Sequence, residues 1–171
     1  MKRTPWVDRK FSNIEDNALL PSIIERLDGT FVRISDKISR TNPELQTVKK
    51  NGKWSIREHI GHLGDLEPLW LRRVDDFVNG LSEMRAADMT NKKTHKANHN
   101  AVDAKVLLQR FHEQRMEFVW TVRSLSDEQL LLHSLHPRLK ISMRIVDLAY
   151  FVAEHDDHHL ADIREIISVS E

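Results

Sequence analysis

Apolar residues recur along most of this chain at intervals of three and four positions, the spacing of one face of an α-helix. Four stretches keep this pattern long enough to form long helices, at about residues 21–40, 55–79, 102–124 and 142–168. Strand-like alternation is hard to find, and only 5 glycines and 5 prolines interrupt the chain. The pattern therefore predicts an all-α protein.

The second of these helices has the clearest ends. Ser55 and Glu58 form the S-x-x-E pattern of a capping box, in which each side chain accepts a hydrogen bond from an otherwise unpartnered backbone amide. Asn79 and Gly80 favour the left-handed backbone that ends a helix. Pro68 removes one hydrogen bond inside the helix, so we expect a kink there.

The connections between the helices differ greatly in length. The segment 81–100 is polar and without clear periodicity, and a connection of this length usually covers a site or is mobile. A second capping-box pattern at 126–129 predicts a short turn of helix, and 138–141 predicts a brief extended piece. Together these features predict an up-and-down four-helix bundle with a long loop between helices 2 and 3, formed as a single domain by residues 1–171.

Composition narrows the function without identifying it. Lys+Arg and Asp+Glu both number 26, so no net charge favours nucleic acid or an anionic membrane surface. The chain has no cysteine, which excludes disulfides and thiolate nucleophiles of its own. The basic residues 1–6 are not followed by the apolar stretch of a signal peptide, and no apolar run is long enough to cross a bilayer. We therefore expect a cytoplasmic protein.

The fourth helix carries the most informative motif, two histidines four residues apart. His155 and His159 point to the same side of a helix, so both imidazoles can bind one metal ion. They share that side with the apolar residues Leu148, Val152, Ile163 and Ile166. Because a helix buries its apolar side, the motif predicts a metal site inside the bundle.

A second pair with the same spacing, His95 and His99, lies in the polar segment. Lys92, Lys93 and Lys96 surround this pair, and their positive charges oppose the binding of a divalent cation. We therefore interpret the pair as part of a solvated loop.

Two histidines do not complete a metal site, because zinc and similar ions take three or four ligands. The second helix offers His59 and His62. His59 lies nearer the middle of the apolar stripe of this helix, and His62 lies at its margin beside Leu66 and Leu69. Helical periodicity does not choose between the two.

Two motifs resemble those of the DinB-like superfamily of four-helix metal-binding proteins, and within it the YfiT group. They are W-S-I-R-E-x-I-x-H-L in the second helix and H-D-x-H-H-L-x-x-I in the fourth. The likeness extends over about residues 20–167. It implies that His62, His155 and His159 are the metal ligands, and that the protein is a metal-dependent hydrolase or a bacillithiol transferase.

One position departs from the family pattern. Many members read L-G-Q-I after the last histidine, where this chain reads Leu160-Ala161-Asp162-Ile163. Asp162 projects near the histidines, either as an outer hydrogen-bond acceptor or as a fourth ligand. A fourth protein ligand would close the site and favour a structural metal, whereas a water molecule in that position would favour catalysis.

Three neutral imidazoles leave most of the charge of a dication uncompensated. That charge lowers the pKa of a bound water or stabilises a bound thiolate, and either one is a nucleophile. Zinc and nickel are the expected metals. The leading hypothesis is a metal-dependent hydrolase, or a transferase that joins a low-molecular-weight thiol to an electrophile. The alternative is a non-catalytic, stress-linked metal-binding bundle.

Four further residues are candidates for roles near the metal. Glu58 or Asp65 is the candidate proton acceptor, and Asp65, one turn after His62, is placed to orient that imidazole. Arg73 and Arg115 are candidates for contacts with an anion at the mouth of the bundle.

Two sets of large apolar residues have simpler interpretations. Trp54, Trp70 and Trp120 are expected to pack in the core. The leucines at 130–132 form either part of a homodimer interface or a cap on the end of the bundle.

Overall fold

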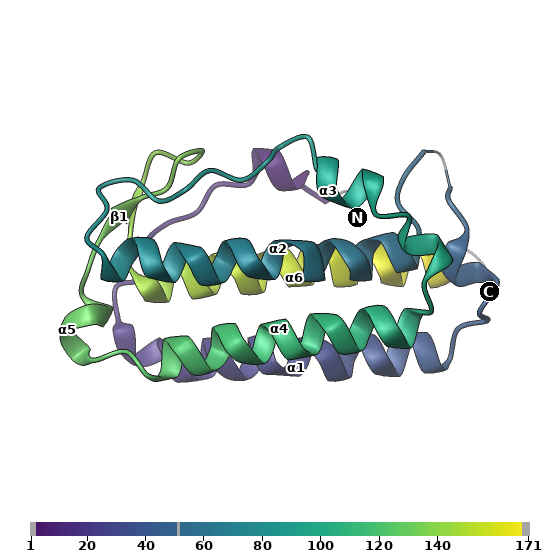
Figure 1. The fold of residues 1–171 in the computed structure, drawn as a ribbon, viewed down its shortest axis with the longest axis horizontal. Coiled ribbons are helices and arrows are strands. Elements are labelled where there is room, and N and C mark those ends of the chain that lie inside the picture. Colours follow the sequence, from purple (N-terminus) through teal and green to yellow (C-terminus); the bar gives the residue numbers. More distant parts are fainter. Residues whose placement is uncertain (1–2, 51, 169–171) are drawn as a thin grey trace.

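The computed structural model describes residues 3–50 and 52–168, and most of them lie in four long helices. These are α1 (Leu20–Ser39), α2 (Ile56–Val78), α4 (Ala104–Arg123) and α6 (Ile145–Ser168), shown in Figure 1. The shorter elements are η1 (Trp6–Asp8), η2 (Asn17–Leu19), η3 (Leu45–Thr47), α3 (Lys92–Lys96), η4 (His99–Ala101), α5 (Asp127–Leu130), β1 (Ser134–Leu135) and β2 (Ser142–Met143). The predicted all-α four-helix bundle is confirmed. Within the described ranges, no helix is both long and apolar enough to cross a membrane; residues 1–2 of the basic amino-terminal stretch lie outside those ranges.

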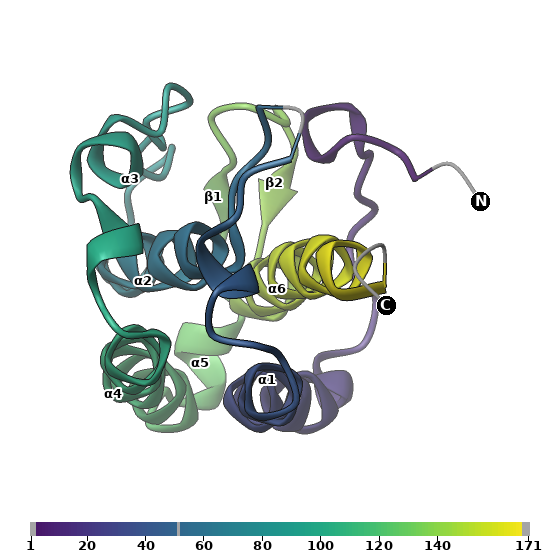
Figure 2. The ribbon, with the colours of Figure 1, turned by 90° about the vertical axis from the view of Figure 1, so that its right-hand side faces the viewer.

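The four long helices form two layers (Figure 2). One layer holds α2 and α6 side by side, and the other holds α4 beneath α2 and α1 beneath α6. The amino-terminal segment, α3 and the antiparallel β1–β2 hairpin cover the outer face of the α2–α6 layer. Side chains on the outer face of the α2–α6 layer therefore lie beneath these covering segments rather than in open solvent.

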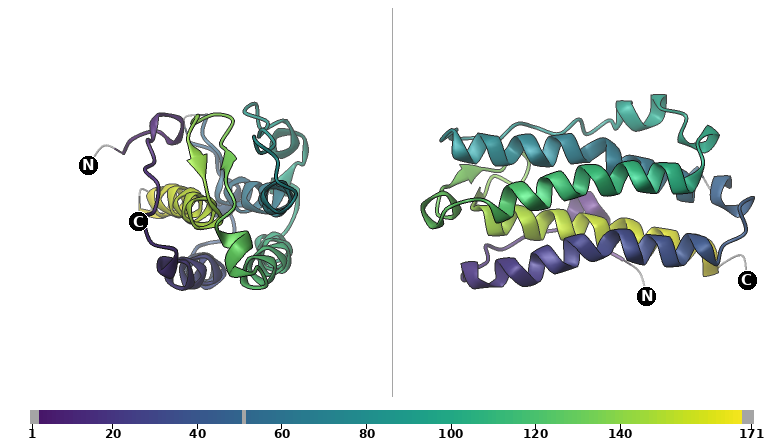
Figure 3. Two further views of the ribbon diagram at one scale, coloured as in Figure 1. Left: turned by 90° about the vertical axis from the view of Figure 1, so that its left-hand side faces the viewer. Right: turned by 60° about the horizontal axis from the view of Figure 1, so that its bottom comes forward.

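The helices do not alternate strictly in direction. Near the start of α2, Arg57 donates a hydrogen bond to the carbonyl of Val102, just before α4, and further along both helices Glu67 pairs with Arg115. The helices α2 and α4 therefore run parallel, and the order of directions is up, down, down, up rather than the predicted up-and-down order. The reason is the long connection, 79–103, which returns over the length of α2 before α4 begins (Figures 1 and 3).

The ends of α2 follow the local signals. The hydroxyl of Ser55 accepts a hydrogen bond from the amide of Glu58 (3.2 Å), and the carboxylate of Glu58 accepts one from the amide of Ser55 (2.9 Å). Gly80 follows the helix with a φ of +69°, a conformation that favours glycine. The helix continues through Pro68. Its capped start sets the position of His62, about two turns into the helix.

The connection 79–103, which we call the covering segment, is held at both ends. Met84 is buried, and its amide donates a hydrogen bond to the carbonyl of Leu135 in β1 (3.1 Å). Arg85 forms an ion pair with Asp76 on α2. The short helices α3 and η4 follow, and Thr94 of α3 is buried. The covering segment is therefore anchored on the bundle at both ends, while most residues from 85 to 93 between them are exposed.

A buried polar layer separates the two halves of the apolar core. One half is built around Trp70, Phe77, Phe118 and Val152, and the other around Ile60, Leu63, Phe111 and Ile163. Between them, Arg115 donates hydrogen bonds to Glu67 and Asp156, and Thr30 donates one to Asp156. Arg115 is only 1% exposed. The prediction that Arg115 contacts an anion at the mouth of the bundle is therefore wrong.

The leucines at 130–132 lie at the end of the bundle. Leu130 packs against the apolar core, as expected of a residue that caps the bundle. Leu131 is 57% exposed. Only part of this run is therefore used to close the core.

Candidate metal centre

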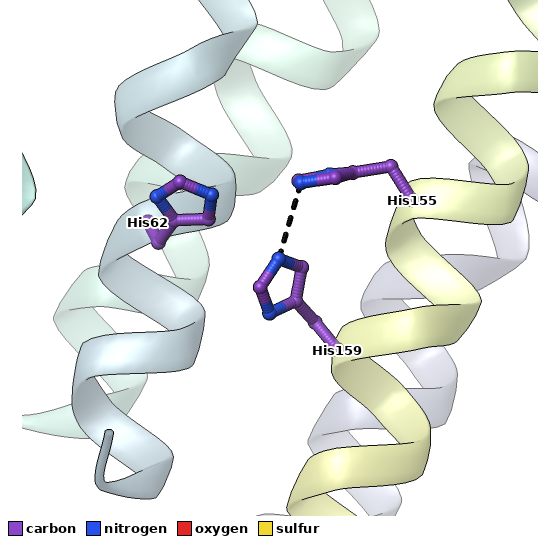
Figure 4. A group of neighbouring side chains, drawn as sticks. All are labelled: His62, His155 and His159. Carbon is purple, nitrogen blue, oxygen red and sulfur yellow. Dashed lines mark hydrogen bonds between the residues drawn. The ribbon is translucent and has the colours of Figure 1, made fainter. Parts of the chain in front are cut away.

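The three histidines that the family resemblance marks as ligands lie together. His62 comes from α2, and His155 and His159 come from successive turns of α6 (Figure 4). We call these three residues the histidine cluster. One ring nitrogen from each histidine lies within 4.8 Å of the other two, and all three side chains are buried. Nitrogen ligands of a tetrahedral zinc ion lie about 3.4 Å apart, and the Nε2 atoms of His155 and His159 are 3.1 Å apart. The donor set and its spacing fit a divalent ion.

Burial keeps these imidazoles in the form that binds metals. Removal from water lowers the pKa of His62 to about 3, and it lowers the pKa of His155 and of His159 well below the usual range. A neutral ring offers a nitrogen lone pair without first losing a proton. In addition, Nδ1 of His155 is buried without a hydrogen-bond partner among the described residues. The other nitrogen of this ring, Nε2, faces His159, so the ring proton resides on Nδ1 when Nε2 binds an ion.

A chain of hydrogen bonds orients His62. The carboxylate of Asp65 only accepts, so the hydroxyl of Thr94 donates to it (2.9 Å) and in turn accepts from Nδ1 of His62 (3.0 Å). His99 lies 2.9 Å from the same carboxylate oxygen through its Nε2. Although burial opposes ionisation, the hydrogen bonds from His99 and Thr94 keep the pKa of Asp65 below its usual range. The proton on Nδ1 leaves Nε2 of His62 with its lone pair for an ion.

Removal of the Thr94 hydroxyl tests this chain. Thr94→Val keeps the shape of the side chain but takes away the acceptor for His62, so metal affinity should fall roughly 10- to 100-fold. Competition with a chromophoric chelator measures the affinity. The matched control is Thr90→Val, because the hydroxyl of Thr90 donates to the exposed Asp88 in the same segment and not to a histidine of the cluster. Equal affinities in the two variants would show that Thr94 does not orient a ligand.

The close fit of the covering segment depends on Gly61. A Cβ atom at this position would lie 2.3 Å from the ring of His99. Gly61→Ala should therefore displace His99 and lower the free energy of unfolding by about 1–3 kcal/mol, as overpacking does. Urea denaturation provides the measurement. Gly29→Ala is the control, since a Cβ there meets nothing within 4 Å, and a stability loss of the same size in both variants would contradict the role of the contact.

His59, the other candidate on α2, also reaches the cluster. Its Nδ1 lies 2.8 Å from Nδ1 of His159, so His159 faces His155 with one nitrogen and His59 with the other. His59, His159 and Asp162 form a second group whose ligand atoms lie within 4.8 Å. The carboxylate of Asp162 also forms an ion pair with Arg3. Arg3 therefore competes for the carboxylate that the sequence offered as a fourth ligand.

The two candidate proton acceptors, Glu58 and Asp65, do not face the histidine cluster directly. Glu58 serves the capping box and forms an ion pair with Lys49 at 2.6 Å. Burial would raise the pKa of Glu58, but the hydrogen bonds from Lys49 and Ser55 outweigh it and lower that pKa. Asp65 lies behind His62 and reaches it through Thr94. Neither carboxylate lines the cavity beside the histidine cluster, and the role of either as a proton acceptor stays a prediction.

A cavity of about 950 Å³ opens beside the histidine cluster. The amino-terminal segment, the covering segment and the β1–β2 turn all contribute to its walls. The ring centroids of Trp54 and His62 lie 4.5 Å apart, and those of Trp6 and His155 lie 5.0 Å apart. Trp70 lines the cavity as well, whereas Trp120 is 64% exposed. The prediction that the tryptophans pack in the core is therefore confirmed for Trp70 and wrong for Trp120, whereas Trp54, like Trp6, borders the histidine cluster.

The second histidine pair separates in the structure. His95 is exposed, as a solvated loop predicts, but His99 is buried against Gly61 and Asp65. In the described part of the chain, neither belongs to a group of converging ligand atoms. The covering segment therefore contributes to the site through Thr94 and His99 rather than through a metal-binding pair.

The helical bundle and the histidine cluster define the class of protein. The family model of the DinB superfamily matches residues 24–163, and the chain belongs to that superfamily. A similar solved structure is YfiT from Bacillus subtilis, described as a probable metal-dependent hydrolase with an unusual four-helix bundle topology. It has a TM-score of 0.77 and 19% identity, with 93% of each chain covered.

Two other solved structures share this fold. The mycothiol-dependent maleylpyruvate isomerase has a TM-score of 0.67 and 11% identity, over 84% of this chain and 60% of that one. The colibactin self-resistance protein ClbS, solved in complex with double-stranded DNA, has a TM-score of 0.62 and 13% identity, over 85% of this chain and 93% of that one. Identities this low show a common fold alone. Among curated proteins, none matches the chain by sequence.

Proposed function

We propose that this chain is a metal-dependent enzyme acting as a single domain over residues 1–171. In this proposal His62, His155 and His159 hold a zinc or nickel ion, and one coordination position opens to the cavity. The observation that carries the proposal is the convergence of three buried, neutral imidazoles from two helices on the wall of a cavity large enough for a small molecule. The reaction is hydrolysis, or transfer of a small thiol to an electrophile.

A divalent ion at the cluster would supply the charge that makes a water or a thiol nucleophilic at neutral pH. The chain contributes the surroundings of that reaction. Thr94 and Asp65 hold His62 in one orientation. The rings of Trp6 and Trp54 border the cluster and offer a flat apolar surface to a substrate. Together they limit the access of bulk water to the reacting groups.

Both reaction types have support. The description of YfiT favours hydrolysis, and the fold shared with a mycothiol-dependent enzyme favours thiol chemistry. Since the chain has no cysteine, any thiol in the reaction must enter as a substrate. A low-molecular-weight thiol is compatible with the size of the cavity.

The test begins with protein purified without a histidine tag or a nickel column. Elemental analysis should find about one ion per chain. Electrophiles should then be offered with several low-molecular-weight thiols, and simple esters and amides in parallel. We expect turnover in one of the two panels, lost on treatment with a chelator and restored by the metal. Metal at full occupancy without turnover in either panel would count against an enzyme.

The second candidate function is a non-catalytic metal-binding protein. The observation that favours it is the proximity of Asp162 to His59 and His159, because further protein ligands would close the site. The absorption spectrum of the cobalt-substituted protein distinguishes the candidates. A spectrum that changes in Asp162→Asn indicates direct ligation by Asp162, whereas an unchanged spectrum that responds to added thiols or anions indicates an open position.

A further inference from the structure

The cavity has a second polar region, on the part of α2 beyond the histidine cluster. Arg73, His136 and Arg138 line it, and we call these three residues the arginine end. Arg73 lies eleven positions after His62 on the same helix, which corresponds to roughly 16 Å along the helix axis. Trp70 and Phe151, with ring centroids 6.0 Å apart, line the cavity between the two regions. A molecule in the cavity could therefore contact both polar regions through an apolar middle.

The positive charges at the arginine end have no carboxylate partner in the part of the chain that the structure describes. Among the residues that the structure describes, neither Arg73 nor Arg138 forms an ion pair; Arg73 donates to the carbonyl of Arg85 (3.0 Å), and Arg138 to that of Val7 (3.0 Å). Asp76 is the carboxylate near Arg73, and it is bound by the side chain and amide of Arg85. Two guanidinium groups on the cavity wall are thus uncompensated.

Asp88 also lines the cavity, but its carboxylate is engaged elsewhere. It accepts hydrogen bonds from the amide and hydroxyl of Thr90 and from the amide of Lys92. It therefore forms part of its own turn and does not neutralise the arginines.

Hydrogen-bond donors at the arginine end face one another. Nδ1 of His136 accepts from the amides of Arg138 and Leu139, each at 3.2 Å. Burial and the neighbouring arginines lower the pKa of His136 to about 3, so the neutral ring carries its proton on Nε2. However, Nη1 of Arg73 also lies 3.4 Å from Nε2 of His136. Two N–H groups therefore meet where an acceptor would be expected.

A third donor at the arginine end is orphaned. Nη2 of Arg138 is buried and has no hydrogen-bond partner within residues 3–50 and 52–168. Arg73 is only 1% exposed, and although burial lowers its pKa to about 10, it stays charged at neutral pH. A buried cation and unsatisfied donors are costly unless an acceptor binds there.

We infer that the arginine end binds an oxyanion of the substrate, a carboxylate or a phosphate, while the opposite end of that substrate reacts at the histidine cluster. The inference deepens the proposed function and rests on it for the reaction at the metal. Planar guanidinium groups bind both oxyanions in the same way, through paired N–H donors. The substrate class is therefore an anion with an apolar middle.

Binding of simple probes tests the inference without turnover. The probes are 4-phenylbutanoate, 3-phenylpropyl phosphate and the neutral 4-phenylbutanamide, titrated calorimetrically into metal-loaded and chelator-treated protein. At least one anion should bind the chelator-treated protein about tenfold more tightly than the amide does, since each hydrogen bond to a charged group is worth about that factor. The tighter of the two anions identifies the oxyanion.

Single substitutions of the arginines complete the test. Arg138→Gln should weaken binding of the anion about tenfold and leave the amide unchanged, and Arg73→Gln should do the same if circular dichroism shows that it folds. Arg72→Gln is the matched control, because Arg72 is exposed beside Arg73 and bonds to the carbonyl of Pro68. Equal binding of anions and amide, no binding at all, or an unchanged affinity in Arg138→Gln would overturn the inference. If elemental analysis finds no metal in the protein as purified, and this protein still binds the anion, the proposed function alone is overturned.

Discussion

Replacing His155 with alanine is expected to remove most of the metal from the protein. The substitution leaves two of three imidazoles, and the loss of affinity should exceed the roughly 100-fold that a mere orienting partner contributes. His155 is buried, its Nε2 faces His159, and its Nδ1 has no hydrogen-bond partner among the described residues. Elemental analysis after dialysis against a weak chelator would show about one ion per chain falling to a small fraction.

The control for this experiment is His95→Ala. His95 belongs to the other histidine pair with the same spacing and is exposed, so its removal should leave the metal content unchanged. Circular dichroism should show that both variants keep their helices. Full metal content in His155→Ala, or a large loss in His95→Ala, would show that the ion is bound elsewhere.

Replacing Arg115 with methionine is expected to produce the largest loss of stability. The substitution keeps much of the side-chain volume but leaves Glu67 and Asp156 as buried carboxylates without their cation. Removing one partner of a buried ion pair costs about 3–5 kcal/mol. The free energy of unfolding from urea titration measures the effect. Arg110→Met on the exposed side of the same helix is the control and should change stability by less than about 0.5 kcal/mol.

The stability loss in Arg115→Met should depend on pH. Burial raises the pKa of Glu67 to about 7 in spite of Arg115, and without Arg115 that pKa should rise further. A carboxyl whose pKa is raised by folding contributes stability below its unfolded pKa, and this contribution is lost as the pH rises through the folded pKa. The difference in the free energy of unfolding between Arg115→Met and the parent protein should therefore be smaller near pH 5 than near pH 8. A difference that is constant across this range would mean that Glu67 does not carry the effect.

The polar layer also bears on the histidine cluster. Asp156 directly follows His155, and its bonds to Arg115 and Thr30 fix the rotation of α6 about its own axis. A helix turns by about 100° per residue, so Asp156 facing the bundle interior directs His155 and His159 toward α2. Arg115→Met should therefore also bind the metal less tightly than the parent protein does.

Much of the fold could be predicted because its signals are local. The capping box at Ser55 and Glu58 marks the start of α2, and Gly80 lies where the helix ends. The apolar stripe around His155 and His159 correctly indicates that both are buried. The direction of α4 could not be predicted in this way, because the covering segment is long enough to reach either end of the bundle and no local pattern chooses between them.

Parts of the site could not be predicted for a similar reason. Thr94, Arg3 and Trp6 lie outside the four long helices, so no helical periodicity marks them. Arg73 and Arg115 looked alike as arginines within helical sequences, yet Arg115 meets two carboxylates and Arg73 forms an ion pair with none in the described part of the chain. That difference comes entirely from the residues that other segments bring beside them.

The sequence by itself determined the helices, their caps and the burial of one histidine pair, since each depends on residues within a few turns of one another. The tertiary structure decided how α2 and α4 are directed, which groups hold His62, and where positive charge is left unpaired on the cavity wall. These outcomes depend on contacts between segments far apart in the chain. Their energies come from desolvation and hydrogen bonding at the point of contact, which no single segment encodes.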